Sequence, residues 1–591
     1  MFFKRANSDV KSAGRGPVAR LLMQFKKRRE VERRNDEREE RQKERKRNRA
    51  LVAIAKSNQK MGMRLAALLL SCSTLISALL GIYRDRLLNS MYLDTYKVGI
   101  DAYTVAFSIP DFMYLILVSG ALSVTFIPVF NARMAKNNRE SAWQMSASLI
   151  NFFAIMAMII SVVIMIFAPV LVKYIVGPGL SESGQVLATS MMRVIAVNPF
   201  LFSIAAVIGS MQQAVGRFVF YTMAPIIYNI GIIIGALFFT DGISIFGHQI
   251  FGGGIMGVAL GVVLGAAMQL IVSSVGLLGL GFDYRFKIFW KNRGFRQVLS
   301  MLPTRSADQG LDYVSQMIDT NLASRMADGT IRAYQQAGTL YNMPINLIGV
   351  AISTAAFPQL SSDVAKGDTA KFAAQLRSTL RTIIWLALPV AVGMFFVRGY
   401  LVSIIDRGGN GLIASLLGVL CIATFLRSVF HIASRSFYAF QDTRTPFKVS
   451  LATLSISVAF ELWFVLALHT GILGVAWAQV IWAILELACL FVLILRKVPN
   501  LFTHKFWLAV IRMAIAAVVM GIVTYMLVNV FDLKFENQNM LMVLIPLGII
   551  VIISALVYGA MSSILKLEEI VPVVSYLRRI LTGRFMIKEK K

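Results

Sequence analysis

Long apolar segments, separated by short polar stretches, recur along most of this sequence after residue 60. Each segment is about 20 residues long, which is the length a helix needs to cross about 30 Å of hydrocarbon. A helix also satisfies its own backbone hydrogen bonds where water is absent. The pattern predicts about fourteen spans, near residues 64–88, 101–130, 144–175, 186–211, 218–240, 252–281, 297–324, 335–360, 374–397, 412–438, 447–469, 472–495, 505–530 and 540–564. The predicted fold class is therefore an all-α polytopic membrane protein.

Lysine and arginine alternate between the loops on the two sides of these spans. Loops that follow even-numbered spans are basic, as in residues 133–139 and 285–296. The opposite loops, such as 176–179, 240–242 and 469–471, contain none. Because basic loops stay in the cytoplasm, both termini are predicted to be cytoplasmic, which requires an even number of spans.

Two segments six spans apart resemble each other, which indicates an internal repeat. In Ser123–Lys136 and Ser353–Lys366, small residues precede a proline (Pro128 and Pro358), and a lysine follows eight residues later. Coincidence is the alternative explanation for two such short segments. A repeat displaced by an even number of spans predicts two parallel six-helix lobes around a central cavity. The predicted divisions are a basic cytoplasmic N-terminal arm (1–60), an N-lobe with helices 1–6 (61–281), a C-lobe with helices 7–12 (282–497), two C-terminal helices (498–566) and a basic cytoplasmic tail (567–591).

The composition agrees with a membrane protein and changes how the net positive charge of the chain is interpreted. Hydrophobic residues make up 57% of the chain and charged residues 15%, against about 25% charged in soluble domains. The net charge of +29 would suggest nucleic acid in a soluble protein. Here the basic residues lie mainly at the ends and in alternate loops, so we expect a topology signal and no nucleic-acid partner. The arm 1–60 is either a solvated tail or a contact for anionic lipid.

Motifs for enzymatic or nucleotide-driven chemistry are absent from the sequence. The three cysteines, Cys72, Cys421 and Cys489, lie in apolar segments without a CxxC pair, so neither a metal site nor a disulfide framework is indicated. There is no GxxxxGK[ST] and no HExxH motif. We therefore expect a non-enzyme without a cofactor, driven by an ion gradient, the membrane potential or a substrate gradient, with the coupling ion unidentified.

Polar residues within spans mark candidate functional positions, because charges are costly at membrane depth. Arg84 and Asp85 close span 1, where Arg84 could hold an anionic head group that Asp85 orients. The alternative is an interfacial ion pair beside a snorkelling Arg86. Pro110 and Pro344 interrupt spans 2 and 8 and are candidate gating positions, or simple packing kinks.

Spans 7 and 10 each carry a charged face. Arg305, Asp308, Asp312 and Asp319 lie in span 7; the acids are three to four residues apart or multiples of that spacing, so they share one face that should line a cavity. These carboxylates are also candidates for binding a coupling cation, Na⁺ or H⁺. In span 10, Arg427, His431 and Arg435 share a face that either pairs with the span 7 acids, which we favour, or contacts an anionic substrate. Glu461 and Glu486 are interpreted as structural acids.

Several short motifs follow one another along the chain. They are Gly81–Asp85, Asp101–Asp111, Gly120–Ser123, Phe126–Phe130, Ile318–Ser324, Met343–Val350, Phe357–Ser361, Phe437–Ala439 and Asp442–Pro446. Together they resemble the MurJ (MviN) lipid II flippase family. The resemblance implies a MOP-superfamily exporter with fourteen helices and two lobes around a cationic cavity. It implies flipping of lipid II, the undecaprenyl-pyrophosphate-linked peptidoglycan precursor, from the inner to the outer leaflet of the bacterial cytoplasmic membrane for cell wall synthesis and cell shape. The best-matched functional residues are Arg84, Asp85 and Asp101.

The sequence departs from the family pattern at positions where many members carry arginine. These positions hold Ala78, Tyr114, Leu115 and Thr339, and Ser119 stands where an acid is common. Arg305, Arg325, Arg332 or Arg427 would have to compensate. The exact cargo therefore stays open between lipid II, another polyprenyl-linked glycan and a small cation or drug. A membrane scaffold tethered through residues 1–60 is the alternative of a different class.

Overall fold

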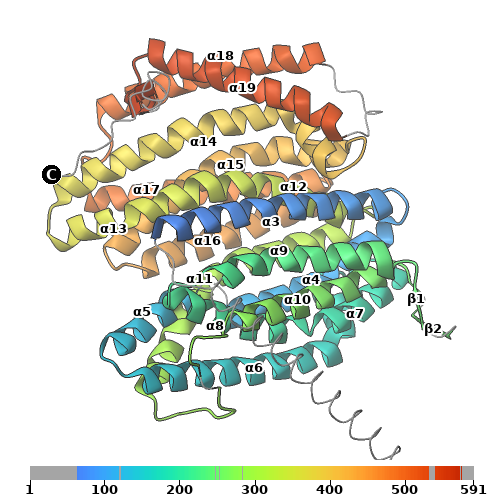
Figure 1. The fold of residues 1–591 in the computed structure, drawn as a ribbon. Helices are drawn as coiled ribbons and strands as arrows, with labels where there is room; N and C mark the ends of the chain where they lie inside the picture. The colour runs from blue at the N-terminus through green and yellow to red at the C-terminus, as the bar shows by residue number, and fades with distance from the viewer. Residues whose placement is uncertain are drawn as a thin grey trace, which may run out of the picture.

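The computed structural model describes residues 63–118, 121–245, 248–251, 253–282, 284–531, 540–572 and 574–575. Within these residues the chain forms a bundle of long, roughly aligned helices with one small hairpin at its edge (Figure 1). The predicted arm 1–60 and most of the predicted tail 567–591 lie outside the described residues.

The first half of the chain forms eight α-helices and a β-hairpin within the described residues. Their bounds are α3 Met63–Tyr92, α4 Lys97–Leu117, α5 Ala121–Ala135, α6 Arg139–Val170 with the π-helical η1 Leu171–Val176, α7 Glu182–Ile195, α8 Asn198–Ala214, α9 Val219–Ile234 with η2 Gly235–Phe239, the antiparallel strands β1 Ile243–Ile245 and β2 His248–Phe251, and α10 Met256–Val275. Helices α9 and α10 approach closely because glycines face each other. A Cβ on Gly231 would lie 2.2 Å from the Cα of Gly265, and one on Gly235 would lie 2.4 Å from the Cα of Gly261. Such small-residue contacts are typical of membrane helices.

The second half begins with the polar helix α11 and ends with an apolar helical pair. Its elements are α11 Arg293–Ser324, α12 Thr330–Pro344, η3 Ile345–Val350, α13 Ala351–Ala365, α14 Thr369–Ile405, α15 Gly411–Ala439, α16 Arg444–Leu462, η4 Trp463–Ala467, α17 Ile472–Lys497, α18 His504–Phe531, α19 Met540–Ile564 and the 3₁₀ turn η5 Glu568–Ile570. Helices α18 and α19 lie outside α14 (Figure 1). Tyr558 donates a hydrogen bond to the carbonyl of Trp385 on α14 (2.9 Å), and the Trp385 indole donates to Ser562 (3.1 Å).

The number of spans agrees with the sequence prediction. Thirteen helices of the described chain are long and apolar enough to cross a membrane, and α11, with 32 residues, is long enough but more polar. Predicted span 2 is divided into α4 and α5, and predicted span 4 corresponds to the continuous pair α7 and α8 over Glu182–Ala214. Helix α11 also contacts α4 and α5 of the first half as well as α12 and α16 of the second, so it lies at the boundary between the two predicted lobes.

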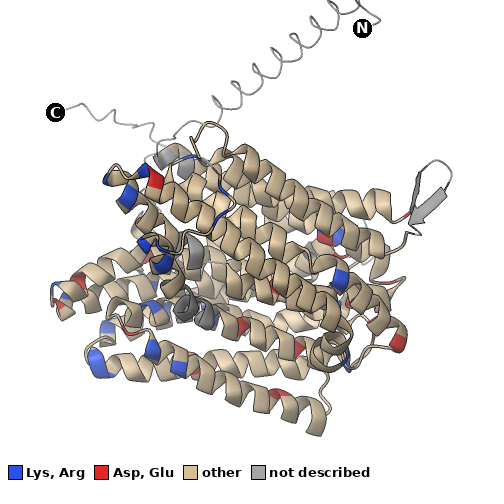
Figure 2. Ribbon diagram, turned by 90° about the horizontal axis from the view of Figure 1, so that it is seen from below, with Lys and Arg blue, Asp and Glu red and all other residues tan. Residues whose placement is uncertain are grey.

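Charge is distributed unevenly along the bundle. Figure 2 shows most lysine and arginine residues gathered at one end. We call this the basic end; it contains the connections 136–138, 276–292, 366–368, 440–443 and 498–503. The other end, called the opposite end here, contains the connections 93–96, 177–181, 325–329, 406–410 and 468–471. The basic and non-basic loops that alternate along the sequence therefore lie at the two ends of one helical bundle.

Candidate functional site

A cavity of about 410 Å³ lies between α4 of the first half and four helices of the second half. Helices α11, α12, α15 and α17 complete its wall. The polar and charged residues of the lining are Thr104, Ser108, Asp111, Asp312, Ser315, Gln316, Asp319, Thr320, Gln335, Thr339, Asn342, Arg427, His431 and Gln479. A polar chamber among membrane helices is the arrangement expected of a transport site.

The acidic face of α11 faces this cavity, as the spacing of its acids predicts. Asp312, Gln316 and Asp319 are lining residues. The side chains of Arg305 and Asp308 lie outside the described residues, so their predicted roles stay predictions. In its second half, α11 therefore tolerates polar side chains because they face a chamber rather than lipid.

Asp319 belongs to a buried polar group that joins three helices. Tyr334 of α12 donates a hydrogen bond to Asp319 (2.9 Å), and the amide of Gln479 on α17 donates a second (3.0 Å). The fully buried Glu461 of α16 accepts from Ser457 (3.4 Å), and its other carboxylate oxygen has no partner within the described chain. The charges of Glu461 and Asp319 interact. Burial of two neighbouring negative charges is costly without a compensating cation.

Arg427 points into the cavity wall but is already paired. Its guanidinium donates to Glu486 of α17 at 2.8 Å and lies 3.9 Å from the ring centre of Trp482. The ion pair joins α15 to α17, which gives Glu486 a structural role. Asp312 of span 7 lines the same cavity and interacts electrostatically with Arg427, so the predicted pairing of Arg427 with the span 7 acids stays a prediction. His431 lines the cavity, whereas Arg435 is half-buried and lies outside its lining.

The described lining is more acidic than the resemblance implies. Asp111, Asp312 and Asp319 face the chamber, against Arg427 and His431. Thr339, at a position where many members of the resembled family carry arginine, is also a lining residue. The expectation of a cationic cavity is thus corrected for the described residues, because Arg84 and Arg332 are placed elsewhere by the fold.

Arg84, Asp85 and Arg332 form an ion-pair network near the opposite end. Asp85 lies 3.1 Å from Arg84 of the same helix and 3.3 Å from Arg332 of α12. Arg332 also donates to Asn89 (2.9 Å), and Arg84 donates to Asn229 of α9 (3.0 Å). The Arg332 side chain is 3% exposed, whereas that of Arg84 is 24% exposed. Asp85 thus joins the two halves of the chain through a buried arginine.

Asp101 caps a helix of the other half of the chain. Its two carboxylate oxygens accept the backbone N–H groups of Gly329 (2.6 Å) and Arg332 (2.8 Å) at the start of α12. These N–H groups have no partner within their own helix, and a carboxylate also interacts favourably with the positive end of the helix dipole. Asp101, buried on α4, therefore fixes α12 against α4.

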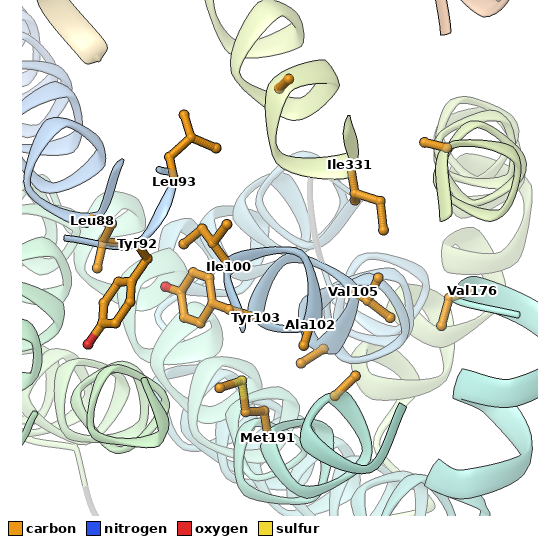
Figure 3. Packing of buried hydrophobic residues seen from close by; sticks show 14 of the residues in the cluster. Leu88, Tyr92, Leu93, Ile100, Ala102, Tyr103, Val105, Val176, Met191 and Ile331 are labelled. Carbon is orange, nitrogen blue, oxygen red and sulfur yellow. The ribbon is translucent and has the colours of Figure 1, made fainter. Parts of the chain in front are cut away.

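A short loop completes the contact at this end. The N–H of Gly179 donates to the Ser324 hydroxyl (3.1 Å), and Asn321 donates to the carbonyl of Ile175 (2.6 Å). Figure 3 shows part of the apolar cluster between the two halves, in which Leu88, Ile100, Val105, Val176 and Ile331 come from α3, α4, η1 and α12. The two halves of the chain are therefore closed against each other at the opposite end.

Helix α3 is also fastened to the end of α14. Arg86 donates to the carbonyl of Ile404 (2.9 Å), and Asn89 donates to that of Ile405 (2.8 Å). Asp406 follows directly, and burial, with a contribution from the charge of Asp94, raises the pKa of Asp406 to about 6. The charge at this end therefore changes in the mildly acidic range.

The two prolines proposed for gating occupy different settings. Pro110 lies within α4 and is buried. Pro344 ends α12 and is followed directly by the π-helical segment η3. Since proline removes a backbone donor and a π-helical turn widens the helix, both positions weaken the helical hydrogen-bond ladder beside the cavity.

Comparison with known proteins assigns this chain to a family. The sequence profile described as "Lipid II flippase MurJ" matches residues 96–555, which is most of the chain. The chain belongs to the lipid II flippase MurJ family. Among similar proteins, the probable lipid II flippase MurJ of Thermotoga maritima is 26% identical over 510 residues, covering 85% of this chain and 96% of that protein. The lipid II flippase MurJ of Burkholderia cenocepacia is 25% identical over 425 residues, covering 70% and 80%.

Solved structures share the fold. A structure described as lipid II flippase MurJ in an inward closed conformation has a TM-score of 0.66 and 23% identity, covering 84% of this chain and 98% of that chain. An inward-facing MATE family multidrug transporter of the MOP superfamily has a TM-score of 0.60 and 14% identity, covering 74% and 98%. The MurJ family fold, related to that of MATE transporters, is thereby shown, and this family consists of transporters rather than enzymes.

Several residues of this MurJ family site were missed in the sequence. Asn89, Asn229 and Gly179 bind across helices. A polar amide inside an apolar span is itself a signal, because such groups need partners in the membrane. Gly179 gave no local signal in the sequence, because its role depends on contact with the backbone and hydroxyl of Ser324, 145 residues away.

Removing the cross-helix cap is expected to loosen the opposite end. We expect Asp101→Ala to destabilise the closed arrangement by about 1–2 kcal/mol, because two backbone donors lose a charged acceptor. The measurement is labelling of Thr104→Cys by a membrane-impermeant maleimide, after replacement of Cys72, Cys421 and Cys489 by serine. Asp241→Ala, at an exposed residue, is the matched control. Unchanged labelling in Asp101→Ala would refute this role.

Proposed function

We propose that this chain moves lipid II from the inner to the outer leaflet of a bacterial cytoplasmic membrane for cell wall synthesis. The observation that carries this proposal is the family match over residues 96–555, supported by a polar cavity between the two halves of a membrane bundle. The basic end faces the cytoplasm in this proposal, by the positive-inside rule, so both termini are cytoplasmic. The predicted lobes, 61–281 and 282–497, are the units that rock.

Alternating access supplies the mechanism. With the opposite end closed by Asp101, Asp85 and Gly179, the pyrophosphate and sugars enter from the basic end while the polyprenyl tail stays in hydrocarbon. A charged head group needs cationic partners within the membrane. Arg427 lies at the cavity, and the Arg84 side chain is partly exposed; Arg305 and Arg435 are proposed to contact the head group nearer the basic end.

Opening the opposite end would release Arg84 and Arg332 from their shared partner Asp85. The two guanidinium groups would then be free to hold phosphate as the head group passes. Asp85 and Asp101 would exchange their protein partners for solvent or for the sugars. Pro110 and Pro344 are the proposed pivots of this movement, because both interrupt helices that line the cavity.

The acids of α11 are proposed to couple transport to a cation gradient. Asp319 and Glu461 form the buried group best suited to exchange Na⁺ or H⁺. Asp319 accepts from Gln479 of α17, Glu461 accepts from Ser457 of α16, and Ser457 lies within reach of the carbonyl of Ala478, the residue before Gln479. Asp312 faces the same chamber, and Asp308 is included on its spacing alone. A bound cation would reduce the repulsion between these carboxylates and so favour one arrangement of the surrounding helices.

An exporter of a small cation is the second candidate. The observation that favours it is the acid-rich cavity lining, with Asp111, Asp312 and Asp319 against one arginine that is already bound to Glu486. The fold shared with MATE transporters permits this function. A cation exporter would depend on the α11 acids and would be indifferent to Arg84.

Complementation tests the proposal directly. The chain is expressed in a walled bacterium whose own lipid II flippase can be depleted, and lysis and inner-leaflet lipid II are followed. The native chain is expected to rescue growth. Arg84→Ala is expected to lower flipping about 10- to 100-fold, the cost of one charged hydrogen-bonding partner, while Lys366→Ala, at an exposed lysine of the basic end, is expected to retain it.

Three outcomes separate the candidates. Rescue by the native chain that is lost in Arg84→Ala supports phosphate recognition, and its additional loss in Asp312→Asn supports the proposed coupling role of the α11 acids. No rescue, together with cation export that is lost in Asp312→Asn, supports the second candidate. Rescue that survives both substitutions but disappears when residues 1–60 are removed supports a tethered scaffold, and membrane levels of every variant are matched by immunoblot.

A further inference from the structure

A large basic groove lies at the basic end of the first half of the chain, separate from the central cavity. It measures about 1060 Å³ and is bordered by the end of α5, the start of α6, the connection 287–292 and the start of α11. None of its lining residues lines the cavity between α4 and α11. Its cationic lining residues are Arg133, Lys136, Lys287, Lys291 and Arg293.

The backbone that carries three of these cations is held firmly on α6. Asn151 donates to the carbonyls of Arg285 (2.9 Å) and Lys287 (3.1 Å), the N–H of Phe289 donates to Ser148 (2.9 Å), and Asn292 donates to the carbonyl of Ser141 (2.9 Å). The connection is therefore an ordered part of the fold, and the backbone positions of its lysines are fixed.

Aromatic packing reinforces the same connection. The ring of Trp290 packs against Phe295 (5.5 Å between centres) and Phe152 (6.3 Å), and Phe282 packs against Trp143 (5.4 Å). Trp290 nevertheless remains 58% exposed. An exposed tryptophan beside lysines is typical of the boundary between hydrocarbon and lipid head groups.

The charge of the groove is not compensated by the protein around it. No aspartate or glutamate is among its described lining residues. None of its five cations forms an ion pair with a carboxylate of the described chain. Glu140, near the rim, accepts a hydrogen bond from Gln144 (3.0 Å). Five uncompensated cations around one hollow create a strong local attraction for an anion.

An apolar groove of about 590 Å³ adjoins the basic groove on the same connection. Tyr284 and Phe286 border it, and Lys287, the next residue, lines the basic groove. The other walls come from α6, α8 and residues 277–282, with Ile150, Ala154, Ile155, Met158, Phe200, Ile204, Ile208, Leu277, Leu278 and Phe282. Met158 is 51% and Phe286 83% exposed, and α6 runs along the edge of the bundle (Figure 1). This groove therefore faces the lipid.

We propose that these adjoining grooves bind one anionic phospholipid of the surrounding bilayer, with its phosphate in the basic groove and an acyl chain in the apolar groove. The chemistry of the two grooves matches the two parts of such a lipid. Basic pockets at the cytoplasmic ends of membrane helices bind anionic head groups, and apolar area at the lipid face accommodates hydrocarbon. A soluble phosphate compound would use the basic groove alone.

The bound lipid would bridge the two halves of the chain where they join. Arg133 belongs to α5, Lys287 and Lys291 to the connection, and Arg293 to the first residue of α11. The lipid phosphate would therefore hold α5, the connection and α11 in one arrangement. This site does not depend on the cargo that the central cavity carries.

The test measures binding of phosphatidylglycerol to the purified full chain in detergent by native mass spectrometry. Lys287→Ala combined with Lys291→Ala is expected to weaken binding about 30-fold, at roughly 1 kcal/mol for each basic residue near the head group. The control pair, Lys366→Ala with Lys448→Ala, removes two exposed lysines of the basic end and is expected to leave binding unchanged. Equal binding by both pairs would overturn the proposal.

Two further arms separate the lipid from a soluble ligand. Ala154→Trp, which fills the apolar groove without changing charge, is expected to weaken phosphatidylglycerol binding while leaving binding of inorganic pyrophosphate unaffected. If pyrophosphate displaces the lipid at equal concentration and Ala154→Trp has no effect, the site binds soluble phosphates and the lipid proposal fails. Thermal unfolding of each variant verifies that the fold is intact, and a neutral lipid, phosphatidylcholine, reports binding that does not depend on charge.

Discussion

Replacement of Gly179 by alanine is expected to prevent closure of the opposite end and to lower lipid II flipping about 10- to 100-fold, through overpacking of about 1–3 kcal/mol. A Cβ at this position would lie 2.4 Å from both the Cα of Arg325 and the carbonyl oxygen of Ser324. These are backbone atoms, which cannot move aside as a flexible side chain can. The loop 177–181 must therefore retreat, and the hydrogen bond from Gly179 to Ser324 is lost with it.

Labelling of Thr104→Cys by a membrane-impermeant maleimide, added on the side of the membrane that the opposite end faces, measures this opening. Depletion–rescue growth measures the loss of flipping. The matched control is Gly399→Ala on α14, where an added Cβ meets no atom within 4 Å. We expect that variant to label and grow like the native chain. If Gly179→Ala remains closed and active, close approach at this loop is not required for transport.

Removal of the Arg427 guanidinium is expected to have the largest effect on stability. Arg427→Ala leaves Glu486, whose side chain is 1% exposed, as a buried charge without its cation. Breaking such a pair lowers the free energy of unfolding by about 3–5 kcal/mol, because the remaining charge keeps its desolvation cost. The packing of the guanidinium over Trp482 is lost as well. Thermal unfolding of the purified protein in detergent measures the change.

A double replacement distinguishes stability from transport. Arg427→Met combined with Glu486→Leu removes both charges while keeping volume, and we expect it to recover most of the lost stability. Recovered folding without recovered flipping would indicate that Arg427 contacts the cargo. Recovery of both would indicate a structural pair only. Arg435→Ala, at a half-buried residue of the same helix outside the cavity lining, serves as the control for the stability measurement alone, because Arg435 is itself a proposed contact of the head group. An equal loss of stability there would contradict a special role for the Arg427–Glu486 pair.

The sequence predicted features that depend on local length and periodicity. The spans followed from apolar runs, and the polar face of α11 followed from acids at helical spacing, which the cavity lining confirms for Asp312 and Asp319. The division of span 2 into α4 and α5 could not be placed, because both pieces are apolar and share one hydrophobic run. The family followed from short motifs that lie along one chain in order, which requires no knowledge of packing.

Only the tertiary structure decided which charges meet. Asp85 pairs with a residue 247 positions away, Asp101 caps α12 from α4, and Arg427 binds Glu486 of α17. It also showed that Arg84 belongs to the contact at the opposite end and that the described cavity lining is rich in acids.

The physical reason is that the two kinds of feature depend on residues at different distances along the chain. Whether a segment spans the membrane depends on the summed hydropathy of about 20 neighbouring residues, which the sequence contains completely. Which buried charge finds which partner depends on the rotation and register of packed helices, where a shift of one residue turns a side chain by about 100°. The sequence by itself therefore determined the membrane bundle and its family, and the packing of the helices decided the contacts that close it.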